Sequence, residues 1–373
     1  MGFVRVGACV AQGAPLSQKV PTLIELHLEV VEPAAVFGGQ RRTLLGPLME
    51  LMLLVDQCVD MPDDVLVVHG GRLPLGHPQE PRRCRLLGSG AVTPDPSRSL
   101  AGRVALVTGA SRGVGAATAI ALAQAGCAVA CAARSTASQP QRTPGTLDDT
   151  VARIEESGGT AVAIPADLAD EDQVVAMVRT TVDRLGRLDV LVNNAAITFV
   201  GDLDIPARRY ELIMAVNLRA PWVAMREAAP HLQAAGGGAI VNVSSAAALY
   251  PYPTLAAYGV SKAGLERLTV DGAHLLAPFG TAVNCFRIDI PVASEGFVAN
   301  TPGVDRSSWE PPEVAAEGIM WVLGQPATFS GRLLSMWQLR QAEGIMASRA
   351  ERPGAQLQPP LELFTGLAPA PPR

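Results

Sequence analysis

The sequence is long enough and apolar enough to build a sizeable buried core. It has 373 residues, of which 48% are hydrophobic and 17% are charged, which suits one large domain or two ordinary ones. Its formal net charge is −5, and its basic residues do not form a basic stripe. We therefore expect no nucleic-acid partner.

Signals for a membrane, a secretory route or a metal are missing from the sequence. The longer apolar runs fall far short of the roughly 20 residues that a membrane span needs, and the N-terminus lacks the order of a secretory signal. The six cysteines form neither a CxxC pair nor a metal-ligand spacing. We expect a reduced, cytoplasmic protein without a membrane span or a metal site.

The two ends of the chain differ in residue composition from its middle. Residues 1–100 carry scattered Pro, Gly and Arg, and we expect a disordered or weakly ordered extension there. A small extra domain is one alternative, and a translated start upstream of the true one is another. Residues 346–373 form a Pro-rich tail. The catalytic domain is expected at 101–345.

From Gly102 onward, short apolar runs alternate with helical stretches. Strands are expected at 104–107, 127–132, 161–164, 188–192, 239–243 and 281–286. Helices are expected at 115–125, 146–157, 171–185, 206–232 and 256–277. Continuous apolar strands that alternate with helices predict an α/β fold, a doubly wound parallel sheet of the Rossmann-like kind.

A glycine-rich turn follows the first expected strand and precedes a helix. Gly109, Gly113 and Gly115 have the spacing GxxxGxG, which allows a tight turn and the close approach of a pyrophosphate. Glycine triplets also occur in purely structural turns. The strand-turn-helix context favours a dinucleotide site.

The residue after the second strand bears on the choice of cofactor. An acidic residue there would bind a ribose 2′-hydroxyl, but the chain has Arg134. Arg134 and Arg112 could instead bind a 2′-phosphate through charge-assisted hydrogen bonds, or both could be solvated surface arginines. We expect NADP in preference to NAD.

Polar residues also follow the third and fourth strands. Asp167 could accept a hydrogen bond from an adenine amino group, or it could form an Asx turn or a helix cap. The run Asn193-Asn194-Ala195-Ala196 lies at the carboxyl end of a strand, where such sheets bind ligands, although an ordinary polar turn is equally consistent with it.

The strongest chemical signal is the pair Tyr258 and Lys262, which are four residues apart on one helical face. The pKa of a free tyrosine, about 10, is too high for a base near neutrality, and a neighbouring ammonium lowers it. Only two of the 30 basic residues are lysines, Lys19 and Lys262. The alternative is a surface pair on an amphipathic helix.

Two further polar residues fit the same chemistry. Ser245 follows the strand at 239–243, and its hydroxyl could donate to a substrate carbonyl or accept from an alcohol. Asn217 is a polar residue in an apolar helix. It could bend the helix and hold a water near Lys262, or it could face solvent.

Residues 101–345 resemble the short-chain dehydrogenase/reductase family, in its single-domain branch with the TGxxxGxG turn. The resemblance rests on that turn, the Asp after the third strand, NNA, the helical Asn, the Ser and YxxxK, in this order. It implies that Tyr258 is the general acid/base, that Lys262 supports it and holds the nicotinamide ribose, that Ser245 orients the substrate oxygen, and that Asn217 supports a proton relay. The cofactor contacts that it implies are Gly109, Ser111, Arg112, Gly113, Val114, Gly115, Arg134, Asp167, Leu168, Asn193, Ala195, Tyr258 and Lys262.

Two stretches depart from the family pattern. NNAG is replaced by NNAA, and the Pro-Gly expected after the last strands is absent between Asn284 and Val292. The connection at 135–147 is also longer than usual. By the resemblance, the backbone near Ile290 to Val292 would contact the nicotinamide amide, so the missing Pro-Gly bears on the cofactor geometry there.

The substrate class follows only weakly from the sequence. A lid expected at 293–309 and the loop 246–257 carry apolar and aromatic residues, which favours a small hydrophobic alcohol or ketone. The resemblance favours a homodimer or homotetramer. Two other functions remain open, a non-catalytic dinucleotide-binding sensor and an epimerase or dehydratase of the same family.

Overall fold

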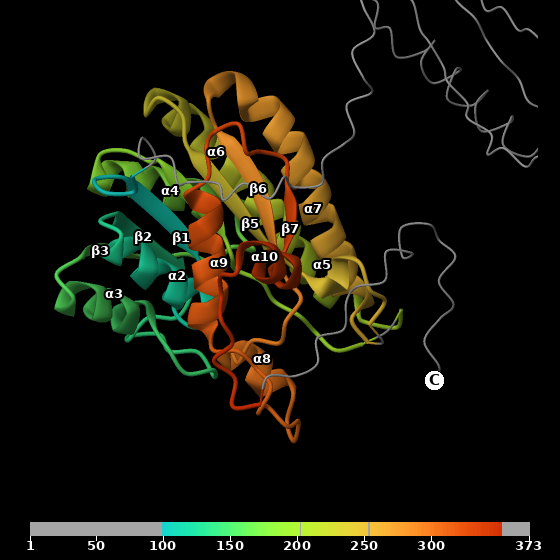
Figure 1. Ribbon diagram of the computed structural model, residues 1–373. Helices are drawn as coiled ribbons and strands as arrows, with labels where there is room; N and C mark the ends of the chain where they lie inside the picture. Colours follow the sequence, from blue (N-terminus) through green and yellow to red (C-terminus); the bar gives the residue numbers. More distant parts are fainter. Residues whose placement is uncertain (1–98, 202, 253, 353–373) are drawn as a thin grey trace, which may run out of the picture. The chain divides into compact units, whose positions relative to one another are not determined.

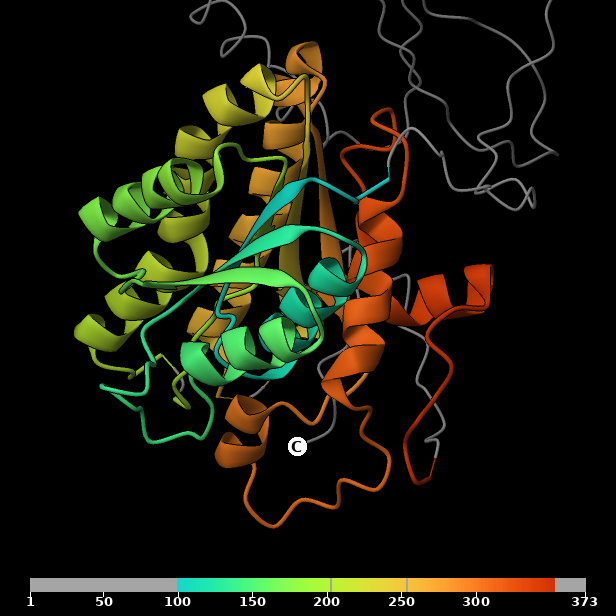
Figure 2. The same ribbon diagram turned by 90° about the vertical axis from the view of Figure 1, so that its left-hand side faces the viewer.

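The computed structural model describes residues 99–201, 203–252 and 254–352. The expectations for residues 1–98 and for most of the Pro-rich tail lie outside these residues. Within them, a seven-stranded parallel sheet carries helices on both faces (Figures 1 and 2). The predicted doubly wound α/β fold is confirmed.

The strands follow the order β3-β2-β1-β4-β5-β6-β7 across the sheet. Their bounds are β1 Val104–Thr108, β2 Ala128–Ala133, β3 Thr160–Pro165, β4 Val190–Asn193, β5 Ala239–Ser245, β6 Ala282–Ile288 and β7 Leu333–Ser335. The order reverses direction between β1 and β4, so the carboxyl ends of these two strands flank the crevice where such sheets bind ligands. The sequence missed β7, a short edge strand without a long apolar run.

The helices form two layers, one on each face of the sheet. Their bounds are α2 Gly113–Gln124, α3 Leu147–Glu156, α4 Glu171–Leu185, α5 Ala207–Met214, α6 Ala220–Ala234, α7 Ala256–Leu276, α8 Glu295–Asn300, α9 Pro312–Leu323 and α10 Met336–Glu343. α2, α3 and α9 pack on one face, and α4, α6 and α7 pack on the other. Because both faces are covered, the central strands are buried along their whole length.

The helix predicted at 206–232 forms, but it is not α-helical throughout. A π-helical turn at Ala215–Arg219 separates α5 from α6, and Asn217 lies within it. Pro221 has no N–H to donate to the carbonyl four residues earlier, that of Asn217, so the regular hydrogen-bond ladder is interrupted there.

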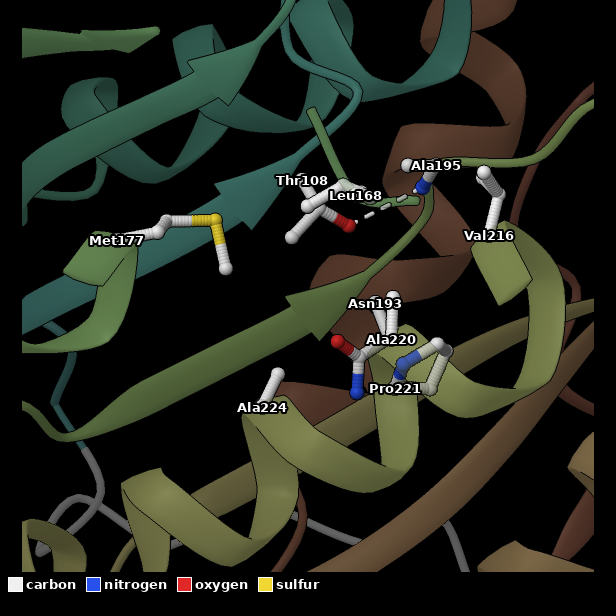
Figure 3. A pocket seen from close by; sticks show the side chains of 9 residues that line it. All are labelled: Thr108, Leu168, Met177, Asn193, Ala195, Val216, Ala220, Pro221 and Ala224. Carbon is white, nitrogen blue, oxygen red and sulfur yellow. Dashed lines mark hydrogen bonds between the residues drawn. The ribbon is translucent and has the colours of Figure 1, made fainter. Parts of the chain in front are cut away.

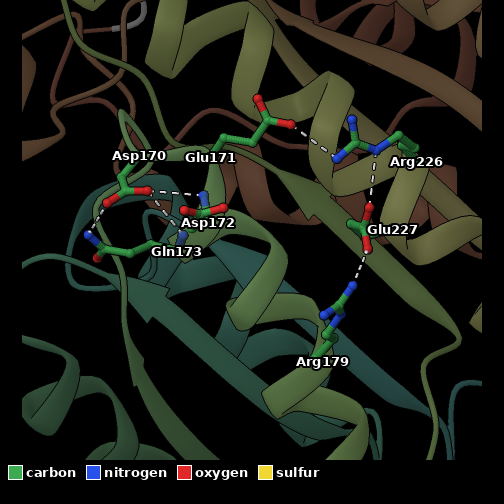
Figure 4. A network of polar contacts seen from close by, with 7 residues as sticks. All are labelled: Asp170, Glu171, Asp172, Gln173, Arg179, Arg226 and Glu227. Atoms are coloured by element: carbon green, nitrogen blue, oxygen red, sulfur yellow. Dashed lines mark hydrogen bonds and ion pairs between the residues drawn. The ribbon is translucent and has the colours of Figure 1, made fainter.

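Ion pairs join α4 to α6 at the surface of the second layer (Figure 4). Arg226 pairs with Glu171 at 3.1 Å, and Arg179 pairs with Glu227 at 3.5 Å. Both arginine side chains are at least half exposed, so each pair contributes little to the free energy of unfolding. The buried apolar contacts beneath them hold these helices to the sheet.

Candidate active site

The glycine turn leaves helix α2 open at its start. Gly109 has φ +68° and Gly113 has φ +56°, which are left-handed conformations that favour glycine. A Cβ on Gly115 would collide with the carbonyl oxygen of Gly109. No side chain caps the first turn of α2, so its amide groups are free to bind an anion such as a pyrophosphate.

Thr108 and Asn194 fasten this turn to the end of β4. The Thr108 hydroxyl accepts from the amides of Asn194 at 3.0 Å and Ala195 at 3.1 Å. The Asn194 side chain in turn donates to the carbonyl oxygen of Thr108 at 2.9 Å. Neither residue was expected to have a role, although Thr108 belongs to the TGxxxGxG motif and Asn194 to the NNA motif.

Three expected cofactor residues, Leu168, Asn193 and Ala195, line a small space beneath the turn (Figure 3). This space is too small for a water molecule, so its lining is closely packed. The Asn193 side chain is buried and donates to the side chain of Asn242 at 2.9 Å. Its side-chain amide is therefore engaged between the two strands β4 and β5.

Asp167 forms the Asx turn that was the alternative to adenine binding. One of its carboxylate oxygens, Oδ1, accepts from the backbone amide of Ala169 at 3.0 Å. Its own amide donates to the side chain of Gln173 at 2.9 Å. The turn does not use Oδ2, so adenine binding stays a prediction.

Arg112 and Arg134 are near enough for the charge of one to act on the other. Burial lowers the pKa of Arg112, and the charge of Arg134 lowers it further, whereas Glu295 opposes both effects. The Arg112 guanidinium donates to three carbonyl oxygens of the long connection after β2, those of Thr143, Pro144 and Gly145, at 2.9, 2.6 and 2.8 Å. Its Nη1 makes none of these bonds, and Arg134 is exposed.

The chemical end of the site brings together Ser245, Tyr258 and Lys262. β5 ends at Ser245, while α7 carries Tyr258 in its first turn and Lys262 one turn later. Burial raises the pKa of the Tyr258 phenol, and a hydrogen bond with the Ser245 hydroxyl works in the opposite direction. The Lys262 ammonium lies 5.8 Å from the centre of the Tyr258 ring.

Lys262 is only 2% exposed. Burial lowers its pKa to about 8, and nearby Cys285 and Glu266 act in the opposite direction. Its Nζ donates to the carbonyl oxygen of Val243 at 2.7 Å. The alternative of a surface Tyr–Lys pair is therefore wrong.

The alternative expectation, that Asn217 faces solvent, is wrong. Its side chain is fully buried, accepts from the amide of Ile197 at 2.8 Å and donates to the carbonyl of Ile197 at 2.9 Å. It also donates to the hydroxyl of Ser261, the neighbour of Lys262, at 3.0 Å. Asn217 thus fixes the segment after β4 against α7.

The loop at 246–257 and the segment at 293–309, which were expected to face the substrate, both carry aromatic contacts. In the loop at 246–257, the Tyr250 and Tyr252 rings meet edge to face with centroids 6.3 Å apart. The segment at 293–309 contains α8, where Phe297 stacks on Trp309 at 4.6 Å. A Cβ on Gly113 would lie 3.0 Å from the Cβ of Ser294, so this segment reaches the glycine turn.

The described residues carry neither a membrane-spanning helix nor a cluster of metal-ligating side chains. Within them, no helix combines the length and the apolar character that crossing a membrane requires. No group of three or more His, Cys, Asp or Glu side chains is arranged for a metal ion in this part of the chain.

Known proteins resemble the chain over this same region. A family model described as short chain dehydrogenase matches residues 103–290. Hydroxysteroid dehydrogenase-like protein 2 of Xenopus tropicalis is 32% identical over 267 residues, which cover 70% of this chain and 63% of that protein. The chain thus spans less than two thirds of the length of this relative.

Two further matches cover most of the other protein. The 3-oxoacyl-(acyl-carrier-protein) reductase of Synechocystis is 36% identical over 206 residues, which cover 54% of this chain and 76% of the reductase. A crystal structure of a short chain dehydrogenase from Burkholderia cenocepacia in complex with NADP is 33% identical with a TM-score of 0.58. That likeness covers 64% of this chain and 97% of the other.

Proposed function

The chain belongs to the short-chain dehydrogenase/reductase family, and on that premise we propose that it transfers a hydride between NADP and a small hydrophobic alcohol or ketone. The observation that carries this proposal is the meeting of Ser245, Tyr258 and Lys262 at the carboxyl end of β5. A dinucleotide sensor would need the glycine turn but not these three side chains together.

Tyr258 is the general acid/base of the proposed reaction. Its phenol lies within hydrogen-bond reach of Ser245, so one carbonyl or alcohol oxygen can contact both hydroxyl groups. Lys262 supplies the positive charge that favours the phenolate. The nicotinamide would supply or accept the hydride at the neighbouring carbon.

The proposed NADP site lies at the glycine turn. The uncapped first turn of α2 would bind the pyrophosphate, and Arg134 with the Nη1 of Arg112 would bind the 2′-phosphate. The charge of Arg134 lowers the pKa of Arg112, so an anion between the two guanidinium groups would favour their charged forms. The neighbour from Burkholderia cenocepacia, described in complex with NADP, supports this choice.

The apolar lining supports the proposed substrate class. Tyr250 and Tyr252 in the loop at 246–257, and the stacked Phe297 and Trp309 in the segment at 293–309, offer aromatic surface for such a substrate. A cytoplasmic location and a homodimeric or homotetrameric assembly stay predictions.

A screen of alcohols and carbonyls with NADPH and NADH tests the function. The absorbance of the reduced nicotinamide is followed for the parent chain and for Tyr258→Phe in parallel. We expect turnover with at least one hydrophobic carbonyl or alcohol in the parent alone. Turnover that is equal in both proteins would refute the assignment of Tyr258, and no turnover with any compound of the panel would count against the proposed reaction.

A further inference from the structure

Behind Lys262, the described structure contains a buried ion pair that the proposed reaction does not use. Glu266 lies one turn after Lys262 on α7, and Arg287 lies on β6. Arg287 donates from Nε to one oxygen of Glu266 at 2.8 Å and from Nη2 to the other at 2.6 Å. The two side chains are only 8% and 7% exposed. A bidentate pair this deep in the molecule holds its two elements in a fixed relationship.

A third charged residue, Asp289, lies beyond the ion pair at the end of β6. Arg287 acts electrostatically on Asp289, the carboxylate that stands two residues later where the strand has ended. Asp289 accepts from the hydroxyl of Ser335 and from the amide of Trp337, at 2.9 Å for the amide. It thereby anchors the first turn of α10 to β6. The expected Pro-Gly of the family is absent from this same stretch.

At the other end of the ion pair, Glu266 acts electrostatically on Lys262. The titratable groups around the Lys262 ammonium are Tyr258 and Glu266 on its own helix and Cys285 on β6. Burial raises the pKa of the Cys285 thiol to about 12, so this thiol is neutral near pH 8. Val243 on β5 and Asn217 on the π-helical turn contribute only uncharged groups. Glu266 is therefore the anion that faces Lys262.

We propose that Glu266, Arg287 and Asp289 are positioning residues for Lys262. Together with Lys262 they form a row of alternating positive and negative charges. The row keeps the Lys262 ammonium charged and fixed beside Tyr258. The row links the catalytic helix α7, the end of β6 and the start of α10. It holds the end of β6 in the place where the family pattern has Pro-Gly. The inference rests on the proposed function only for the role given to Lys262.

The test follows the ionisation of Lys262 directly and needs no substrate. Because Lys19 and Lys262 are the only lysines in the sequence, the full chain labelled with ε-¹³C-lysine gives two NMR signals. A Lys19→Arg variant assigns them. We expect the Lys262 signal of the parent to titrate with a midpoint near 8, in line with its lowered pKa.

Glu266→Gln keeps the shape of the side chain and removes its charge. Its Lys262 midpoint should fall by roughly one pH unit, the lower end of what an opposite charge within about 4–6 Å produces. Asp271→Asn is the matched control, because Asp271 is an exposed carboxylate on the same helix that pairs with Arg267 at 2.9 Å. Its Lys262 midpoint should stay at the parent value. An unchanged midpoint in Glu266→Gln, or an equal shift in Asp271→Asn, would overturn the proposal.

Glu266→Gln leaves Arg287 buried without its partner and could unfold the chain. The double variant Glu266→Gln/Arg287→Gln removes both charges, and its folding is checked by a thermal melt. The midpoint of Lys262 should fall in this variant as well, and a parent midpoint in the folded double variant would also overturn the proposal. A chain without turnover would refute the proposed function and leave this titration unaffected.

Discussion

The Nζ of Lys262 donates to the carbonyl oxygen of Val243 at 2.7 Å, which ties the cation on α7 to the strand that ends at Ser245. The bond fixes the ammonium on the side of α7 that also carries Tyr258, 5.8 Å from the centre of its ring. Ser245, Tyr258 and Lys262 are thus held by one strand and one helix.

Tyr258→Phe should reduce kcat/KM by roughly 10²–10⁴-fold, which is the usual contribution of a general acid/base. The ring and its packing remain, so the affinity for NADPH should change little. Steady-state kinetics and a fluorescence titration of NADPH measure the two effects. Tyr210→Phe is the control, because it removes the phenol of an exposed tyrosine on α5 that the proposed site does not use. Activity of Tyr258→Phe within about tenfold of the parent would contradict the role of Tyr258.

Lys262→Arg should lose most activity even though the charge is kept. The ammonium is a compact group that bonds Val243 in a buried position, and a planar guanidinium of larger size does not fit the same space. The kinetic constants of this variant, measured beside those of a surface variant such as Arg267→Lys, test the point. A neutral outcome would mean that the rarity of lysine in this chain has no bearing on position 262.

Lys262→Met should raise the thermal stability of the chain near pH 7. Burial lowers the pKa of Lys262 from 10.5 to about 8, so the unfolded chain binds this proton more tightly than the folded chain does. Charged Lys262 therefore opposes folding below pH 8 by on the order of 3 kcal/mol, and this cost disappears as the pH rises from 8 to 10.5.

The lost bond to Val243 offsets about 1 kcal/mol of that gain. The melting temperature of Lys262→Met should then exceed that of the parent by a few degrees at pH 7, and the difference should shrink above pH 9. Thermal melts at several pH values measure both trends. A lower melting temperature for the variant at pH 7 would show that the charged side chain stabilises the fold.

Arg134→Ala should weaken NADPH binding by roughly tenfold or more and leave NADH binding almost unchanged. A charge-assisted hydrogen bond to the 2′-phosphate contributes about 1.5–3 kcal/mol, and NADH has no such phosphate. Arg142→Ala is the control, because Arg142 is another exposed arginine in the connection after β2. Equal affinities of the parent for the two cofactors would mean that Arg134 is a solvated surface residue.

The sheet could be predicted because its strands are covered on both faces. Each of the strands β1 to β6 is a short, mostly apolar run, and its position follows from that run within a residue or two. The turn at Gly109 and the spacing of Tyr258 and Lys262 are local patterns, so the sequence reports them directly. The edge strand β7 and helices α8 to α10 follow the last predicted strand. For that part of the chain, only a lid at 293–309 was predicted.

The partners of polar side chains could not be predicted in the same way. Arg112 is bound by backbone carbonyls of a loop more than 30 residues later, and a carbonyl leaves no trace in the sequence. Glu266 and Arg287 are 21 positions apart and meet only because α7 packs on β6. The side chain of Asn193 donates to that of Asn242, 49 positions later, and the two meet only because β4 pairs with β5.

The boundary before the catalytic domain gives the last prediction. A chain that begins near Thr93 should be soluble, bind NADPH and keep its melting temperature within a few degrees. The first strand, β1, lies in the interior of the sheet between β2 and β4, so it needs no edge partner from an upstream segment. All the proposed site residues also follow it in the sequence.

Leu100 shows how close to β1 the shortened chain can begin. It packs against the core, and its carbonyl oxygen accepts from the amide of Arg103 at 3.2 Å and from the thiol of Cys127 at 3.2 Å. A start near Thr93 keeps these contacts, whereas a start after Leu100 would remove them and should lower the melting temperature. Thermal melts of the full chain and the two shortened chains, with and without NADPH, measure this. If the chain from Thr93 fails to fold or loses the NADPH-induced shift, residues upstream of it are needed by the catalytic domain.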